Sequence, residues 1–442
     1  MKRSPLPHGA AYAVLASLAG VVIAVSTAIF LTAGGSGDRP ADRTHEARRS
    51  AAPAATGGWV GAWSTSPAAA ETGTAQGLPG RSIRNVLHTT LAGGSARVHL
   101  SNLFGTTPLT ISHASLALAA TPGGPAAVPG SMRALTFGGR GTVTIPAGRA
   151  TVSDPVRLSV GYAADLMVTT YSPTPSGPVT IHPYARQTAY LADGDRVEDT
   201  DAGSYTTKSP YWRYVTAVDV WSTEARGSVV AIGDSITDGV SSTVGANRRW
   251  TDFLAARLRS EPDAPRYGVL NQGISGNRIL LGGQGASPVN NPSALERFDR
   301  DVLSRAGVRA VVVELGVNDI LRRPKQTDPA RITAGLRQLV ERAHARGVRV
   351  VGSTLTPIDG HKGVVPEQEI VRQGVNAEIR AGRVFDDVVD FDLALRDPAN
   401  PQRLLPAYDC GDHLHPSDAG YRAMADALDL EALKSRPVAA AL

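Results

Sequence analysis

A change of pattern at Gly227 constrains the fold of this chain more than any other feature. From there to about residue 436, short runs of Val, Ile and Ala alternate with amphipathic segments of helical length. Short apolar strands that alternate with helices are typical of a parallel sheet covered by helices on both faces. The pattern predicts strands at 228–232, 269–272, 309–315, 348–354 and 388–391, and helices at 250–260, 292–304, 330–346, 367–381 and 416–434.

The segment before Gly227 has a different pattern. Its short runs alternate apolar and polar residues, Gly and Pro separate them, and no long stretch has helical periodicity. Many short strands at this spacing predict an all-β sandwich of the jelly-roll type. A chain of 442 residues is long enough for two domains, and we predict a β-sandwich at 58–226 and an α/β domain at 227–436. The β-runs lie at 82–91, 96–100, 109–118, 141–145, 156–160 and 165–171.

The N-terminus has the pattern of an export signal. Lys2 and Arg3 precede an apolar run at 10–33, and positive residues before such a run keep the start of the chain in the cytoplasm. The run exceeds the core of a cleaved signal, about 7–15 residues, and fits the roughly 20 residues of a spanning helix. The run contains many small residues (Ala, Gly, Ser and Thr), which is also compatible with removal by cleavage. Residues 1–33 are therefore predicted to be either a signal peptide or a membrane anchor. Residues 34–57 predict a flexible linker, and the rest of the chain is expected outside the cytoplasm, secreted or anchored at the membrane's outer face.

The charge and cysteine content exclude several classes of function. The 45 basic and 40 acidic residues give a net charge of +5 without blocks of like charge, which argues against nucleic-acid binding. Cys410 is the single cysteine, so neither an internal disulfide nor a cysteine-based zinc site can form. Asp234, Asp238 and Asp319 lie beside glycine turns, where Asp commonly bonds its own backbone. We therefore expect no metal site and no cofactor.

Polar residues follow the predicted strands of the α/β domain. Ser235 lies in the run GDSITDG after the first strand, Gly276 follows the second strand, and Asn318 follows the third. Near the C-terminus Asp412 precedes His415 by three residues, a spacing that lets a carboxylate orient an imidazole. An ordinary turn or helix cap explains each of these alone. Because ligands of such sheets bind beyond the carboxyl ends of the strands, the set together predicts a nucleophile, a base, an orienting acid and oxyanion donors in one site.

Three further residues, Asp234, Arg278 and His413, lie beside these segments. Asp234 and Arg278 are candidates for substrate contacts, because they flank Ser235 and Gly276. His413 is expected to lie outside the catalytic set, because it lacks the three-residue spacing from Asp412. Every residue expected to do chemistry belongs to 227–436, so hydrolysis of small esters is not expected to need the β-sandwich.

These segments resemble the conserved blocks of the SGNH hydrolases, also called GDSL-type esterases and lipases. Residues 233–239 match the first block, Gly276 the second, residues 316–319 the third, and Asp412 with His415 the fourth. The resemblance covers residues 227–436 and implies a flavodoxin-like, three-layer α/β/α domain and metal-free ester hydrolysis. It further implies Ser235 as nucleophile, His415 as base and Asp412 as its orienter. The oxyanion hole would consist of the Ser235 and Gly276 N–H groups and the Asn318 side chain.

The plan of a β-rich module before the hydrolase is similar to that of a secreted bacterial subgroup grouped with xylan esterases. We therefore favour a carbohydrate O-acyl (acetyl) esterase over a lipase or phospholipase, since a β-sandwich suits polysaccharide binding and no long apolar lid is evident. The expected partner is a small-molecule or polysaccharide ester, with membrane contact only through residues 10–33. A carbohydrate-binding protein with an inactive hydrolase domain is the alternative from another class, and the complete residue set argues against it.

Overall fold

The parallel sheet of the α/β half determines where the polar residues of the site can lie. The computed structural model describes residues 57–283 and 291–434. Its five parallel strands are ordered β18-β17-β19-β20-β21, a doubly wound order in which β17, the first strand of the α/β half, lies second in the sheet. Their bounds are β17 (Gly227–Gly233), β18 (Tyr267–Gly273), β19 (Val308–Glu314), β20 (Arg349–Ser353) and β21 (Asp387–Val389).

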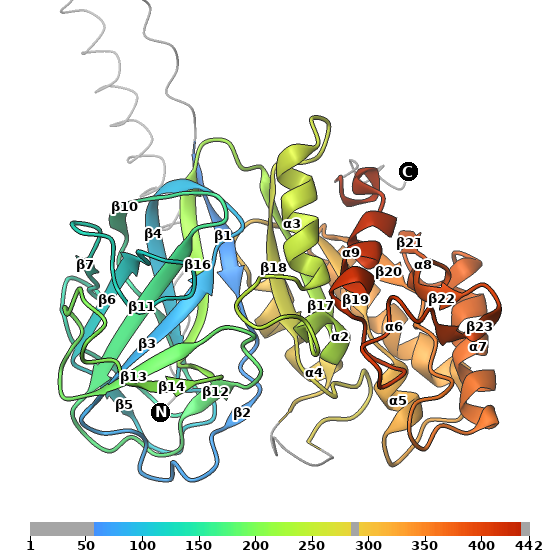
Figure 1. The fold of residues 1–442 in the computed structure, drawn as a ribbon, viewed down its shortest axis with the longest axis horizontal. Helices are drawn as coiled ribbons and strands as arrows, with labels where there is room; N and C mark the ends of the chain where they lie inside the picture. Colours follow the sequence, from blue (N-terminus) through green and yellow to red (C-terminus); the bar gives the residue numbers. More distant parts are fainter. Residues whose placement is uncertain (1–56, 284–290, 435–442) are drawn as a thin grey trace, which may run out of the picture. The chain divides into compact units, whose positions relative to one another are not determined.

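Helices cover both faces of this sheet, as the sequence pattern predicts (Figure 1). Alternate residues of β17 point to opposite faces, so Val230 and Ile232 join one buried cluster while Val229 and Ala231 join the other. The first cluster includes side chains of α4 (Ala294–Phe298), the π-helical turn η1 (Asp299–Leu303), α6 (Pro329–His344) and α7 (Pro366–Arg380). The second includes side chains of α3 (Trp250–Ser260), α8 (Phe391–Leu395), α9 (Asp418–Ala427) and the 3-10 turn η2 (Leu430–Leu433). The α/β prediction is therefore confirmed.

Most element boundaries differ from those predicted, and the last helix, for example, ends at Ala427 and not at residue 434. Side-chain caps explain two of the differences. The last helix begins at Asp418 and not at residue 416, because the Ser417 side chain accepts a hydrogen bond from the N–H of Gly420 (3.3 Å) and caps it. The strand expected at 388–391 ends at Val389, because Asp390 caps α8 by accepting from the N–H of Leu393 (3.0 Å). Side-chain caps thus override apolar runs at both positions.

Residues 57–226 are rich in strands and contain no helix. An antiparallel five-stranded sheet has the path β1-β16-β4-β10 with β9 beside β4, and a six-stranded sheet has the order β14-β13-β3-β11-β6-β7. Smaller sheets pair β15-β12-β2 and β5-β8. The strand-rich prediction is confirmed, while the jelly-roll arrangement stays a prediction. The bounds are β1 (Gly58–Ser64), β2 (Ala69–Ala70), β3 (Arg81–His88), β4 (Gly93–Ser101), β5 (Leu109–Ile111), β6 (His113–Leu118), β7 (Arg133–Ala134), β8 (Val143–Ile145), β9 (Ala150–Val152), β10 (Val156–Val160), β11 (Asp165–Ser172), β12 (Thr180–His182), β13 (Ala189–Asp193), β14 (Thr207–Ser209), β15 (Trp212–Arg213) and β16 (Val215–Ser222).

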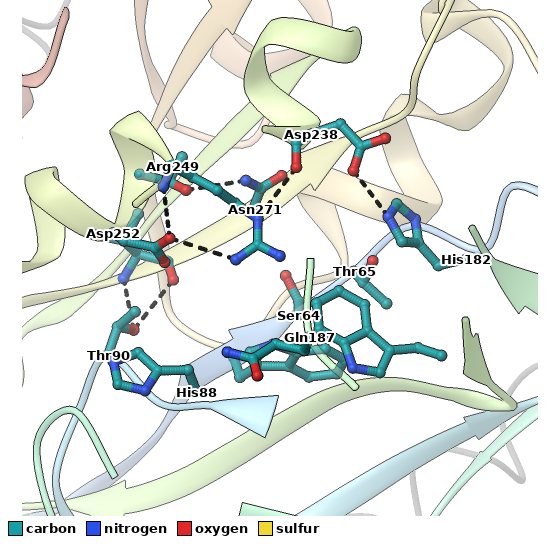
Figure 2. A pocket seen from close by; sticks show the side chains of 14 residues that line it. Ser64, Thr65, His88, Thr90, His182, Gln187, Asp238, Arg249, Asp252 and Asn271 are labelled. Atoms are coloured by element: carbon teal, nitrogen blue, oxygen red, sulfur yellow. Dashed lines mark hydrogen bonds and ion pairs between the residues drawn. The ribbon is translucent and has the colours of Figure 1, made fainter. Parts of the chain in front are cut away.

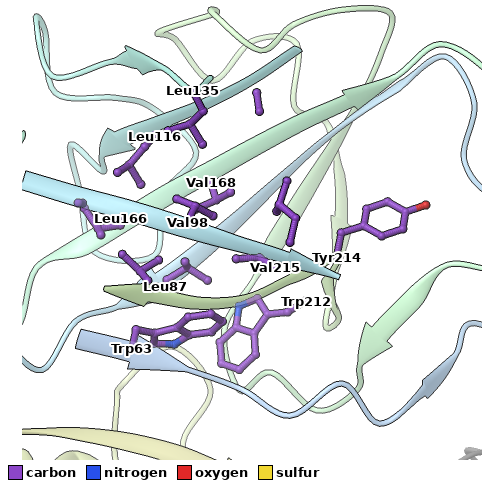
Figure 3. Close-up of a cluster of buried hydrophobic side chains, with 14 of the residues drawn as sticks. Trp63, Leu87, Val98, Leu116, Leu135, Leu166, Val168, Trp212, Tyr214 and Val215 are labelled. Carbon is purple, nitrogen blue, oxygen red and sulfur yellow. The ribbon is translucent and has the colours of Figure 1, made fainter. Parts of the chain in front are cut away.

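A buried apolar cluster holds these sheets together (Figure 3). Leu87, Val98 and Val168 come from β3, β4 and β11, and they pack in the same cluster as Trp63 and Trp212. The two indole rings meet edge to face with centroids 4.9 Å apart, a favourable arrangement for aromatic pairs. Inward-facing residues therefore alternate along the strands as the period-2 pattern requires.

The division of the chain at residue 226 stays a prediction, because residues 55–442 form one compact unit. The predicted signal or anchor at 1–33 and all of the predicted linker except Gly57 lie outside the described residues. Within residues 57–283 and 291–434, no helix is both long and apolar enough to cross a membrane.

Candidate active site

Ser235 lies at the sharp turn that leaves the central strand β17. Gly233 ends the strand, Asp234 caps the single turn α2 (Ser235–Asp238), and Ser235 is its first residue. A Cβ on Gly233 would lie 2.1 Å from Thr237 Oγ1 and 2.9 Å from the Glu314 carbonyl oxygen, so only glycine fits there. The turn thereby places the Ser235 hydroxyl at the carboxyl end of the sheet.

A hydrogen-bonded chain joins Ser235 to the C-terminal loop. His415 Nε2 lies 2.8 Å from Ser235 Oγ, and His415 Nδ1 lies 2.5 Å from Asp412 Oδ2. The second oxygen of Asp412 accepts from the backbone N–H groups of Leu414 (3.0 Å) and His415 (2.8 Å). His413 turns elsewhere, with Nδ1 2.6 Å from Asp409 Oδ2. The structure therefore brings together the three residues predicted as nucleophile, base and orienting acid.

The charge of Asp412 fixes the state of the imidazole. Partial burial raises the pKa of Asp412, but the hydrogen bonds from the His415 side chain and backbone outweigh burial and hold the pKa below its usual range. An ionised Asp412 accepts the Nδ1 proton of His415. The Nε2 lone pair then faces Ser235 Oγ, which is the orientation a general base needs.

Ser235 and His415 open onto a pocket of about 500 Å³, which we call the Ser235 pocket. Gly276 and Asn318, the two other predicted oxyanion donors, also line it. Gly276 follows β18 with φ of 77°, and a Cβ there would lie 2.7 Å from the Arg322 guanidinium. Together the lining residues are Tyr184, Arg186, Ser235, Val240, Ser275, Gly276, Asn318, Leu321, Arg322, His361, Lys362, Gly363, Val364, Leu414 and His415.

Hydrogen bonds at both ends fix the Asn318 amide. Its Nδ2 donates to Asp234 Oδ2 (2.9 Å), and its Oδ1 accepts from Arg322 Nε (2.8 Å). An amide nitrogen carries two hydrogens, so one remains for an oxyanion. The arrangement orients Asn318 as a donor.

Asp234 was predicted to contact the substrate, but its side chain does not line the Ser235 pocket. Its side chain is fully buried, and its other oxygen accepts from the Ile236 N–H (3.0 Å). Burial raises the pKa of Asp234 to about 6, against lowering contributions from the Ile236 N–H, His415, Asn318 and Arg322. Glu314 is buried as well, and its burial and the charge of Asp234 raise its pKa well above the usual range. Two carboxylates whose burial opposes ionisation thus lie beneath the site. Asp234 accepts a hydrogen bond from Asn318 and does not contact the pocket.

The structure does not bring Arg278 into the pocket either. The side chain is 2% exposed, and Nη1 makes a long hydrogen bond to the Arg323 carbonyl oxygen (3.4 Å). The neighbouring backbone is held by Asp319, which accepts from the N–H groups of Ile279 (2.8 Å) and Leu280 (3.1 Å). The position beside Gly276 therefore did not predict contact with the pocket.

Several pocket residues carried no signal in the sequence. Tyr184 and Arg186 come from the strand-rich half, and His361 and Lys362 come from the loop after β20. No motif surrounds them, so only the fold reveals them. Arg322 is different, because it lies four residues after Asn318 at the end of α5 (Val317–Leu321), where helical spacing places two side chains together.

A second, smaller cavity is lined by residues of both the strand-rich half and the α/β half (Figure 2). His182 Nδ1 lies 2.8 Å from the Ser66 carbonyl oxygen, and His182 Nε2 lies 3.0 Å from Asp238 Oδ1. The other oxygen of Asp238 accepts from the N–H (3.0 Å) and the hydroxyl (2.6 Å) of Ser275. The hydrogen-bonded chain therefore ends at Ser275, which immediately precedes the predicted oxyanion donor Gly276.

The described residues contain one group with metal-ligand spacing, and it includes none of Asp234, Asp238 and Asp319. Asp409, Cys410 and Asp412 place ligand atoms within 4.8 Å of one another. Both carboxylates already bond histidines, as described above. Cys410 is exposed, with Ser241 Oγ 3.2 Å from its sulfur.

Comparison with known proteins identifies the α/β half. Residues 231–423 match the model of the GDSL-like lipase/acylhydrolase family, a range that includes Ser235, Gly276, Asn318, Asp412 and His415. The search of curated proteins found no match.

Solved structures to which this chain is similar include a protein assigned to the lipolytic G-D-S-L family from Desulfitobacterium hafniense, at 21% identity over 45% of this chain and 96% of the other, with a TM-score of 0.35. A variant of an acetyl xylan esterase from Geobacillus stearothermophilus is 22% identical over 48% of this chain and 96% of the other, with a TM-score of 0.35. The match shows that residues 231–423 form a GDSL-like lipase/acylhydrolase domain, and it supports a carboxylic ester hydrolase.

Proposed function

We propose that this protein is an extracytoplasmic serine esterase that removes acyl groups, chiefly acetyl, from carbohydrates. The observation that carries the proposal is the continuous chain from Ser235 Oγ through His415 to Asp412 at the pocket. The apolar run at 10–33 behind Lys2 and Arg3 supports a location outside the cytoplasm.

In the proposed reaction, His415 Nε2 takes the hydroxyl proton as Ser235 Oγ attacks the ester carbonyl carbon. The negative charge that forms on the carbonyl oxygen is stabilised by the N–H groups of Ser235 and Gly276 and by Asn318 Nδ2. His415 then protonates the alcohol oxygen as its bond to carbon breaks, which leaves an acyl group on Ser235. A water molecule, deprotonated by the same imidazole, releases the acid and restores Ser235.

The lining of the Ser235 pocket supports a short acyl group and a polar alcohol. Its apolar side chains apart from Tyr184 are Val240, Leu321, Val364 and Leu414, and the others are mostly polar or charged. A long acyl chain would require a more continuous apolar channel. Tyr184 is 50% exposed at the pocket, where an aromatic ring can stack on the face of a sugar.

The test is a series of aryl esters from acetate to palmitate, measured on the full chain beside acetate release from acetylated xylan. We expect the highest kcat/KM with acetate, and we expect Ser235→Ala to abolish turnover while its circular dichroism matches the wild type. Preference for palmitate would favour the lipase alternative. Wild-type turnover in folded Ser235→Ala would overturn the proposed mechanism.

Fractionation of producing cells tests the proposed location outside the cytoplasm. Activity that stayed in the cytoplasmic fraction would contradict that location.

A further inference from the structure

The charged residues of the Ser235 pocket are all of one sign. Arg186, Arg322 and Lys362 line it, and among the described residues of that lining there is no Asp and no Glu. The three cations come from separate parts of the chain, which are the strand-rich half, the end of α5 and the loop after β20. Their convergence on the pocket that contains Ser235 therefore does not follow from a single basic segment.

Among the described residues no carboxylate forms a direct ion pair with these cations, although the charges of Asp238 and Asp418 act on Arg186 and that of Asp234 acts on Arg322. Throughout residues 57–283 and 291–434, no ion pair involves Arg186, Arg322 or Lys362, whereas the buried Arg372 pairs with Glu369 and Asp392. Arg186 donates to the Ser242 carbonyl oxygen, yet its Nε is buried without a hydrogen-bond partner. Burial and the nearby charge of Arg249 lower the pKa of Arg186, against smaller raising contributions from Tyr421, Asp238 and Asp418. The guanidinium is thus incompletely compensated within the protein.

Carboxylates near the pocket are engaged elsewhere. Asp412 bonds His415, and Asp409 bonds His413. Asp359 pairs with Arg403 (2.7 Å), and Asp418 with Arg248 (3.5 Å). Asp234 and Glu314 are buried beneath Ser235 with raised pKa values. The positive charge at the pocket is therefore available to a ligand.

We propose that the ester hydrolysed in the Ser235 pocket carries an anionic oxygen group, a carboxylate or a phosphate, which Arg186, Arg322 and Lys362 attract. This inference rests on the proposed esterase function and narrows its substrate to an acidic ester. Arg322 has the planar fork that matches two oxygens of such a group, and its Nε alone is used by Asn318. Lys362 is an exposed point charge that attracts the group from a greater distance.

The negative group can lie on the acyl or on the alcohol side of the ester, and two pairs of probes separate these sources. The acyl pair is the 4-nitrophenyl monoester of adipic acid and 4-nitrophenyl hexanoate. The alcohol pair is the acetate ester of 4-hydroxy-3-nitrobenzoic acid and the same compound as its methyl carboxylate ester. The measurement is kcat/KM for each ester with the full chain, corrected for spontaneous hydrolysis, at low and high salt.

We expect the anionic member of at least one pair to be preferred, and we expect Lys362→Gln to lower that preference about two- to five-fold. Arg322→Gln lowers it further, and salt near 1 M weakens it because the Debye length falls to about 3 Å. The matched control is Lys208→Gln on strand β14, an exposed lysine outside the pocket, which leaves the preference unchanged.

Equal or better hydrolysis of the neutral member in both pairs would overturn the inference while leaving the esterase function intact. A preference that Lys362→Gln and Arg322→Gln do not change would also overturn it, because the charge would act elsewhere. Absence of turnover with all four esters, or turnover that survives Ser235→Ala, would instead contradict the proposed function itself.

Discussion

His413 and His415 stand two residues apart in the C-terminal loop and bond different carboxylates. His413 bonds Asp409 and is half exposed, whereas His415 lies between Asp412 and Ser235. His413 adopts φ of 63°, a left-handed conformation that separates the directions of the two rings. The roles of two similar residues are thus set by one local turn of the backbone.

At the residue scale, we predict that His415→Ala lowers kcat about 10³-fold or more, because the variant lacks the base that takes the Ser235 proton. His413→Ala is the matched control and is expected to keep kcat within a few-fold. Steady-state hydrolysis of an aryl acetate by both purified variants provides the measurement. A larger loss in His413→Ala would show that the base has been assigned to the wrong imidazole.

At the element scale, the strand and helix that meet beneath Ser235 bury two carboxylates. Asp234 caps α2 and Glu314 ends β19, and Thr237 Oγ1 donates to Glu314 Oε2 (2.9 Å). A buried acid with a raised pKa favours the folded state at low pH, where it is neutral. That stabilisation is lost as pH rises through the folded-state pKa.

We therefore predict that the free energy of unfolding rises when the pH is lowered from 7 to 5. Folding raises the pKa of Asp234 from 3.8 to about 6. This shift contributes about 1–3 kcal/mol to the rise in the free energy of unfolding. Glu314→Gln removes the second buried acid with a raised pKa, so its gain in unfolding free energy between the same pH values is smaller. Urea unfolding at both pH values measures the difference. An equal gain in the wild type and in Glu314→Gln would disprove this account of the pair.

Elements were predictable where local pattern and tertiary packing agree. The helix expected at 250–260 is α3 (Trp250–Ser260), whose buried face includes Trp250, Leu254 and Leu258. The apolar run at 109–118 was expected as one strand, but it divides into β5, which pairs with β8, and β6, which pairs with β11 and β7. The alternation of buried residues shifts by one position at that break, from Leu109 and Ile111 to Ala114 and Leu116, so a single continuous strand could not bury all four residues.

The same distinction separates the site residues. Ser235, Gly276 and Asn318 were predictable because each directly follows a strand of one parallel sheet. Tyr184 and Arg186 were not, because they reach the pocket through the packing of another part of the chain. Asp234 and Arg278 are adjacent to the motif in sequence, but side-chain direction and burial keep both out of the pocket.

At the scale of the whole molecule, polar contacts join the two halves near the site. The buried Arg297 donates to Ser66 Oγ (2.8 Å) and to the Gly233 carbonyl oxygen (3.1 Å), while Gln272 Nε2 donates to Ser64 Oγ (2.6 Å). Burial lowers the pKa of Arg297 to about 10 despite the charge of Asp301. A buried polar group that loses its hydrogen-bond partner destabilises the fold. We therefore expect the stability of each half to depend on the presence of the other.

His182 offers a test of that dependence. We predict that His182→Ala lowers the free energy of unfolding by about 1–3 kcal/mol, because Asp238 and the Ser66 carbonyl group lose a buried partner. It also lowers kcat several-fold, because Asp238 holds the Ser275 N–H beside Gly276. The control is His344→Ala, which breaks an exposed pair with Asp386 and is expected to cost less than about 1 kcal/mol. Identical effects of the two variants on unfolding and turnover would refute the role of His182.

Expressing residues 227–436 without the strand-rich half tests whether ester hydrolysis needs that half. The sequence suggested that hydrolysis of small esters would survive, but the structure places Tyr184 and Arg186 in the Ser235 pocket and joins His182 to Asp238. Removing the strand-rich half takes away these side chains and exposes Arg297 and Gln272, which are buried in the full chain.

We therefore expect the shortened protein to be less stable and to lose activity on aryl acetates as well as on polymeric esters. The comparison uses both proteins on both substrates after folded protein is matched by circular dichroism. A loss confined to the polymer would mean that the strand-rich half only captures substrate. Full activity on both substrates would leave that half without a part in the reaction.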